Sequence, residues 1–76
     1  MMVNVEKYAP NDIIRFMREA TNLTQKEFAK SIGKSTDWVR KNEYGITNFY
    51  FKDLMKIAKI HGFKIQIVKV KDRVAL

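Results

Sequence analysis

Apolar residues recur at spacings of three and four along four stretches of the chain, which is the spacing of one face of an α-helix. The first predicted helix covers about residues 11–21. Pro10 suits its first position because the ring fixes φ near a helical value, and Asn22 tolerates the left-handed conformation that ends a helix. The apolar positions of this helix are Ile13, Ile14, Phe16, Met17 and Ala20.

The start of the second predicted helix carries the most specific local signal. Thr24 and Glu27 have the spacing of a capping box, in which each side chain accepts a hydrogen bond from the other residue's backbone N–H. Leu23 and Phe28 flank the box as a hydrophobic staple. Gly33 closes the helix because glycine adopts a positive φ at little cost. We therefore expect a short helix that begins at Thr24.

Two further helices are predicted beyond this turn. Ser35 can cap a helix over residues 36 to about 44, and Gly45 marks its end. A fourth helix is expected over about residues 49–60, ending before Gly62. Its apolar positions are Phe51, Leu54, Ile57, Ala58 and Ile60.

After Gly62 the apolar period changes from helical spacing to two, which predicts a β-strand. The apolar side of this strand consists of Phe63, Ile65, Ile67 and Val70. A strand without a neighbour leaves its backbone donors and acceptors unpaired, so it needs a partner. That partner is either residues 3–5 of the same chain, which alternate in a similar way, or the same strand of a second copy, which we favour.

The chain of 76 residues is 46% hydrophobic and 30% charged, a composition typical of one small folded domain. We predict a mainly α fold, a four-helix repressor-like helix-turn-helix domain with a C-terminal β-strand. Its parts are an N-terminal arm or short strand at 1–9, the helical domain at 10–61, the dimerisation strand at 62–71 and a tail at 72–76. Without a membrane-spanning apolar run or a signal-peptide pattern, the expected location is cytoplasmic.

Fifteen Lys and Arg against eight Asp and Glu give a net charge of +7, which attracts polyanions and makes nucleic acid the first candidate partner. The absence of cysteine excludes a disulfide framework and thiolate metal sites. His61 is the single histidine and stands beside a helix-ending glycine, where a cation suits the helix dipole. We therefore expect no enzyme activity, no cofactor and no metal.

Small residues at Ala29 and Gly33 permit the close backbone approach that a helix-turn-helix requires, and Val39 lies where it can reach back onto the preceding helix. Over about residues 11–61 the chain resembles the XRE-type helix-turn-helix family, which includes lambdoid phage repressors and many bacterial antitoxins. The matching positions are Leu23, Thr24, Gln25, Phe28, Ala29, Ile32, Gly33, Ser35, Val39, Glu43 and Gly45.

The resemblance implies that the third helix lies in the major groove of duplex DNA, with its N-terminal half reading bases. The base-reading positions are Thr36, Asp37 and Lys41, with Arg40 beside them. Lys41 can donate to guanine, Asp37 can accept from cytosine N4, and Thr36 can touch a thymine methyl. Alternatively, Asp37 is a first-turn acid favoured by the helix dipole, and Arg40 and Lys41 form a solvated basic face.

A second group of residues is expected to position the domain on the DNA backbone. The resemblance assigns a phosphate contact to Gln25, which also braces the reading helix; otherwise Gln25 is an ordinary solvated residue. The other expected phosphate contacts are Lys34, Ser35, Asn48 and Lys52. The resemblance further implies a structural ion pair between Arg18 and Glu43.

Three residues depart from the family pattern. Lys34 replaces a small apolar residue, Asn42 an apolar or aromatic one, and Trp38 a smaller side chain. Trp38 either fills the core above Asn42, which we favour, or presses on the DNA backbone.

The sequence therefore predicts a transcriptional regulator, a repressor that binds a palindromic DNA operator as a homodimer. The alternative is an antitoxin or other interaction module whose main role is to bind a partner protein such as a toxin.

Overall fold

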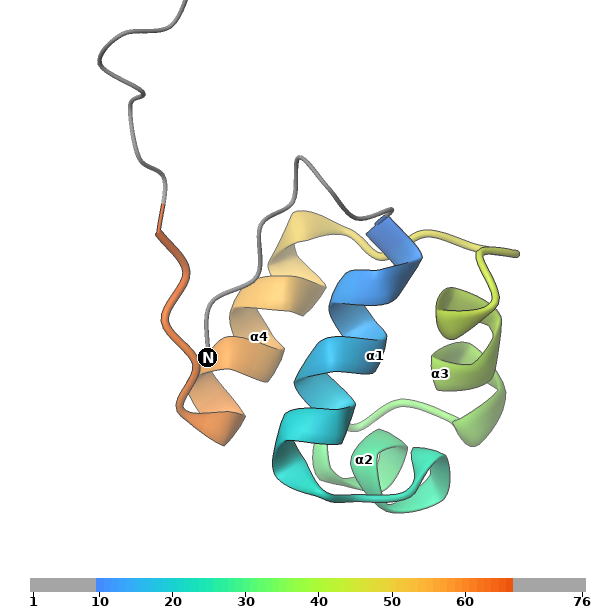
Figure 1. The fold of residues 1–76 in the computed structure, drawn as a ribbon, viewed down its shortest axis with the longest axis horizontal. Coiled ribbons are helices and arrows are strands. Elements are labelled where there is room, and N and C mark those ends of the chain that lie inside the picture. The colour runs from blue at the N-terminus through green and yellow to red at the C-terminus, as the bar shows by residue number, and fades with distance from the viewer. Residues whose placement is uncertain (1–9, 67–76) are drawn as a thin grey trace, which may run out of the picture.

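The computed structural model describes residues 10–66, which form four helices. Their bounds are α1 Pro10–Thr21, α2 Gln25–Ser31, α3 Thr36–Glu43 and α4 Phe51–His61. Figure 1 shows α1 between α4 and α3, with α2 at the end of the domain where α1 finishes. The mainly α fold predicted from the apolar spacing is confirmed for this part of the chain.

The first two turns form as their local chemistry predicts. Asn22 has φ of 60° and ends α1, and Gly33 has φ of 70° after α2. The Thr24 hydroxyl accepts from the Glu27 N–H at 3.1 Å, and the Glu27 carboxylate accepts from the Thr24 N–H at 2.9 Å. These bonds lower the pKa of Glu27, the backbone bond from Thr24 most strongly. The predicted capping box is therefore confirmed, with Thr24 as the cap and Gln25 as the first helical residue.

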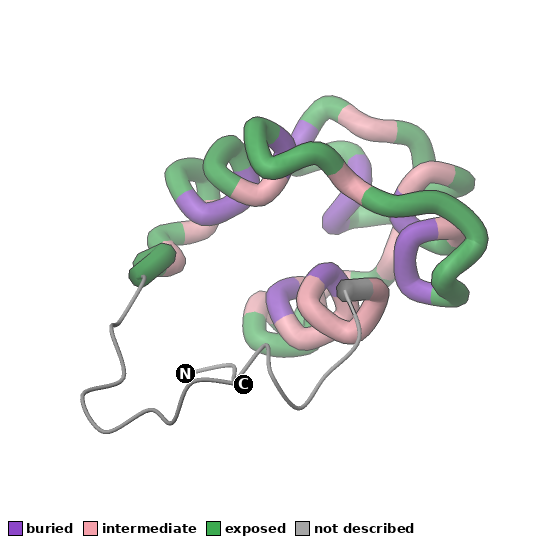
Figure 2. The backbone as a smooth tube through the Cα atoms, turned by 90° about the horizontal axis from the view of Figure 1, so that it is seen from above, coloured by how far each residue is buried: buried purple, intermediate pink, exposed green. Residues whose placement is uncertain are grey.

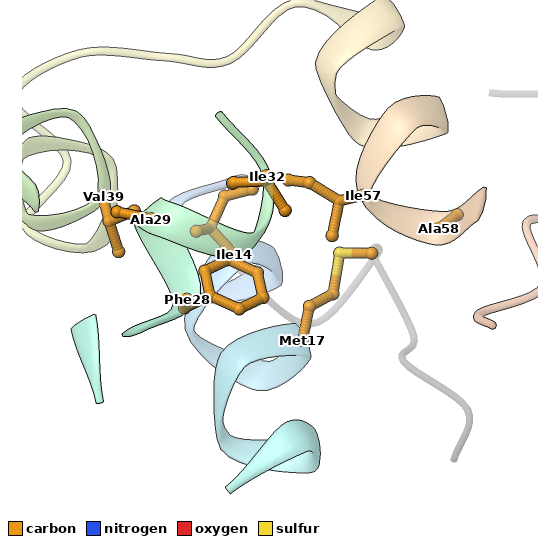
Figure 3. Packing of buried hydrophobic residues seen from close by; sticks show 8 residues of the cluster. All are labelled: Ile14, Met17, Phe28, Ala29, Ile32, Val39, Ile57 and Ala58. Atoms are coloured by element: carbon orange, nitrogen blue, oxygen red, sulfur yellow. The ribbon is translucent and has the colours of Figure 1, made fainter. Parts of the chain in front are cut away.

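The core draws on all four helices and on the turn after α2. Its side chains meet in the middle of the domain (Figure 3), and the buried parts of the helices face inward (Figure 2). The buried apolar residues are Ile14, Met17, Phe28, Ala29, Ile32, Val39, Ile57 and Ala58. Val39 joins α3 to the same cluster as Phe28, Ala29 and Ile32, as the helix-turn-helix pattern predicts. This packing fixes α3 against α1 and α2.

The start of α4 was predicted two residues too early. The helix begins at Phe51, and Tyr50 is its cap residue with φ of −85° and ψ of 154°. The Tyr50 N–H donates to Asp53 Oδ2 at 3.1 Å, so the acid inside the helix satisfies the cap backbone. Phe51 and Ile60 were expected on the apolar face, but they are 58% and 47% exposed.

The strand predicted after Gly62 does not appear in the described part of the chain. Phe63 and Ile65 lie in an irregular segment that ends the described range at residue 66. Phe63 instead packs against the helical core. Ile67, Val70, the predicted arm at 1–9 and the predicted tail at 72–76 lie outside the described residues.

Candidate nucleic-acid interface

Helix α3 presents two chemically different sides. Val39, Asn42 and Glu43 are buried against the rest of the domain. The four residues expected to read bases lie outside the buried set: Thr36, Asp37 and Arg40 are exposed, and Lys41 is partly exposed. The structure therefore places Thr36, Asp37, Arg40 and Lys41 along the accessible side of one short helix.

Asp37 is bound to both cations of this accessible side. Its Oδ1 accepts from Nη2 of Arg40, and its Oδ2 lies 3.0 Å from Nζ of Lys41. The hydrogen bond from Arg40, followed by the bond from Lys41, lowers the pKa of the Asp37 carboxyl below its ordinary value. The spacings of three and four residues bring these side chains together on one helix face.

The start of α3 is fixed by Ser35, whose hydroxyl oxygen accepts from the Trp38 N–H at 3.0 Å. Ser35 is exposed and adopts an extended backbone conformation as the cap residue. Its predicted capping role is confirmed. The cap leaves its hydroxyl proton available to an additional acceptor, such as a phosphate oxygen.

Glu43 connects α3 to both preceding helices. Its Oε2 accepts from Nε of Arg18 at 2.6 Å, and its Oε1 accepts from Nη2 of the same guanidinium at 3.0 Å. Gln25 Nε2 donates to Oε1 at 3.2 Å. The Glu43 hydrogen bond is the main cause that raises the pKa of Arg18. The predicted ion pair is present, and Gln25 braces α3 through it.

The C-terminal end of α3 has two further contacts that the sequence did not reveal. Asn11 Nδ2 donates to the Glu43 backbone carbonyl at 3.2 Å, and Arg15 Nη2 approaches the same oxygen at 3.5 Å. Both residues lie on α1, about 30 positions away in sequence, so no local pattern could indicate these contacts. They satisfy a carbonyl that has no partner within its own helix.

Lys34 links the turn between α2 and α3 to the start of α4. Its Nζ lies 3.1 Å from Asp53 Oδ1 and 5.0 Å from the ring centroid of Trp38. Trp38 is half-buried and packs against the core, in agreement with the favoured interpretation. The ammonium of Lys34 is thus held within the domain. To contact a phosphate, it must either bind the phosphate and Asp53 at the same time or break its ion pair with Asp53.

Burial raises the pKa of Asp53, but hydrogen bonds from the Tyr50 N–H and the Lys34 ammonium outweigh it, so the pKa lies below the ordinary 3.8. The folded state therefore favours the carboxylate. Its contribution to stability is complete above about pH 3.8 and is lost as the pH falls through the folded pKa. Asp53 thus couples the cap of α4 to the position of Lys34.

We expect Asp53→Asn to lower the free energy of unfolding by about 1–3 kcal/mol at pH 7, because the amide keeps the cap acceptor but loses the charge that faces Lys34. The difference from the wild type should shrink below about pH 3.8. Urea unfolding at a series of pH values measures this difference. The other acidic residues titrate in both proteins, so their effect on the free energy of unfolding drops out of the difference. A difference independent of pH would contradict the ionic role of Asp53.

Asn42 is a polar residue that is fully buried in the domain. Its Nδ2 donates to the Trp38 carbonyl at 2.8 Å, whereas Oδ1 is buried with no hydrogen-bond partner among the residues described. A buried acceptor without a donor is destabilising.

We expect Asn42→Leu, which removes the unpaired oxygen at similar volume, to raise the free energy of unfolding by about 1 kcal/mol. The urea midpoint measures the change. Asn48→Leu, at an exposed position, serves as the matched control and should give no gain. A lower midpoint for Asn42→Leu would show that the amide stabilises the core.

The two remaining expected phosphate contacts lie on or before the first turn of α4. Asn48 is exposed in the loop that follows α3. Lys52 is exposed, and its Nζ lies 5.6 Å from the ring centroid of Tyr50. Neither side chain is buried in the domain, so both are accessible to a ligand.

His61 contacts α2, a pairing that the sequence did not indicate. Its Nε2 lies 2.8 Å from Ser31 Oγ, and its ring stacks on Phe28 with centroids 5.3 Å apart. The Ser31 hydroxyl also donates to the Phe28 carbonyl at 2.7 Å. Because a hydroxyl has one proton, Ser31 accepts from the imidazole in this arrangement. The geometry joins α2 to α4 and does not activate Ser31 as a nucleophile.

Among residues 10–66, no group of three or more His, Asp or Glu side chains is arranged to hold a metal ion. No helix in the same range has both the length and the apolar character to cross a lipid bilayer. No protein-family model matches the chain, and no curated protein or solved structure matches it.

Proposed function

We propose that this protein binds duplex DNA by placing the accessible side of α3 in the major groove. The observation that carries the proposal is the division of α3: one side is fixed by Glu43 and the core, and the other presents Thr36, Asp37, Arg40 and Lys41. A reading helix needs this combination of rigid support and polar access. The net charge of +7 supplies the long-range attraction to phosphates.

The dimensions of α3 agree with this role. An α-helix with its side chains is about 10–12 Å in diameter, and the major groove is about 12 Å wide, so one helix such as α3 fits. Lys41 and Arg40 are donors suited to guanine O6 and N7, and Thr36 offers a methyl group and a hydroxyl. Ser35, Gln25, Asn48, Lys52 and Lys34 are proposed to contact phosphates around this helix.

Selection of bound sequences from random duplex DNA tests the proposal. We expect enrichment of one short sequence, present as an inverted repeat if two subunits bind together. If each subunit neutralises about three phosphates, the slope of log K against log salt for a dimer should be about −5. Binding without sequence enrichment would contradict base reading by α3.

A second candidate function is the binding of a partner protein, as an antitoxin or another protein-interaction module. The observation that favours it is a set of large side chains between residues 44 and 55, each more than half exposed. If they form a contiguous patch, such exposed apolar surface is typical of protein-binding sites. The side chains are Tyr44, Ile46, Tyr50, Phe51 and Met55.

Light scattering on the purified full chain separates these possibilities. A mass of twice one chain, together with selection of an inverted repeat, would support DNA binding as a homodimer. A monomer that still selects a single half-site would support DNA reading without self-association. A monomer with no DNA selection would favour the protein-binding role.

A further inference from the structure

Asp37 places a negative charge in the middle of the side of α3 that we propose to face DNA. The side chains of Asp37, Arg40 and Lys41 are 50%, 46% and 43% exposed, so all three are accessible to a ligand. One carboxylate contacts both cations at once. In the free protein, the accessible side of α3 therefore offers a net charge of about +1 where its two cations alone would give +2.

This carboxylate acts differently on different DNA sequences. Phosphates are present at every base pair, and they repel a carboxylate wherever α3 enters the groove. A base edge compensates for that repulsion only where it donates a hydrogen bond, as the N4 amino group of cytosine does. At such a site the carboxylate gains a partner, and Arg40 and Lys41 are free to contact guanine or phosphate.

We infer that Asp37 is a specificity-determining counter-charge, which weakens binding to non-cognate duplex DNA and releases Arg40 and Lys41 where a base amino group binds its carboxylate. This inference rests on the proposed function of α3. It differs from a simple hydrogen bond to one base, because it predicts a gain of affinity for unrelated DNA when the charge is removed.

Asp37→Asn tests the inference, since asparagine keeps the shape of the side chain and removes its charge. The matched control is Glu19→Gln, which makes the same change in net charge at an exposed position on α1. Affinities of the wild type and both variants are measured on a duplex of unrelated sequence and on the selected operator, between about 50 and 200 mM salt. Urea unfolding of each variant confirms that it is folded.

We expect Asp37→Asn to bind the unrelated duplex about tenfold more tightly than the wild type at low salt, with a salt slope steeper by about 0.9. The ratio of operator to unrelated affinity should fall by at least the same factor. Glu19→Gln should change both affinities by less than about twofold, because its charge lies outside the interface.

Three outcomes overturn the inference. Unchanged affinity of Asp37→Asn for unrelated DNA would mean that the carboxylate does not oppose phosphates. An equal gain of affinity for unrelated DNA in Glu19→Gln would mean that the effect comes from the net charge of the protein and not from the position of Asp37. If the wild type itself shows no salt-dependent binding to duplex DNA, the proposed function fails and the inference fails with it; the first two outcomes leave the proposed function intact.

Discussion

Replacing Glu43 with alanine is expected to lower the free energy of unfolding by about 3–5 kcal/mol. Both carboxylate oxygens of Glu43 accept hydrogen bonds, and the residue is only 5% exposed. The truncation leaves the Arg18 guanidinium without its carboxylate and Gln25 Nε2 without its acceptor. Arg18 keeps its bond to the Leu23 carbonyl at 3.2 Å, which does not neutralise the charge.

Urea unfolding followed by circular dichroism measures this loss. A domain of this size has a total stability of roughly 4–11 kcal/mol, so the loss is a large fraction of the total and should lower the urea midpoint strongly. Glu43→Gln is the conservative comparison: it keeps an acceptor for Arg18 and should lose less stability. The exposed Glu19→Ala is the control. A Glu43→Ala variant that melts like the wild type but no longer binds DNA would show that Glu43 acts at the DNA and not in the fold.

Replacing Lys41 with alanine is expected to weaken binding to the selected operator by about 5- to 150-fold, because one donor pair to a base is worth about 1–3 kcal/mol. Among the described residues, the Lys41 side chain forms an ion pair with Asp37 only. Surface pairs of this kind contribute little to stability, so the variant should unfold like the wild type. The base preference should relax at one position in each half-site.

Lys64→Ala is the matched control for this variant. Lys64 is exposed beyond the end of α4, and its loss should reduce affinity by less than about threefold. Repeating the selection with Lys41→Ala identifies the base pair whose preference disappears. A uniform loss on all sequences, with a shallower salt slope, would make Lys41 a phosphate contact. An unchanged affinity would show that Lys41 does not contact the DNA.

The features predicted correctly from the sequence depend on local chemistry. Thr24 and Glu27 satisfy each other's backbone within one turn, and Asn22 and Gly33 adopt the positive φ that their types permit. The accessible side of α3 also follows from spacing within one helix. The Asp37 cluster was predictable on the same basis, since positions three and four apart on a helix meet.

The features that the sequence did not reveal depend on contacts between distant elements. The bond between Lys34 and Asp53 requires α4 to pack beside the turn after α2, and it explains why a lysine is accepted there. The start of α4 is an exception, because it is set by a local contact, the bond from the Tyr50 N–H to Asp53, which a prediction from apolar spacing alone does not take into account. The strand prediction rested on alternation and β-branched content over residues 63–70; residues 63–66 are irregular, and the rest of that stretch lies outside the described residues.

Methylation protection of the selected operator by dimethyl sulfate tests the placement of α3 most directly. Guanine N7 lies in the major groove, and adenine N3 lies in the minor groove. Bound protein is expected to protect guanine N7 in each half-site and to leave adenine N3 reactive at the same base pairs. Reactive guanine N7 throughout the bound site, with protection confined to adenine N3, would contradict a major-groove position for this helix.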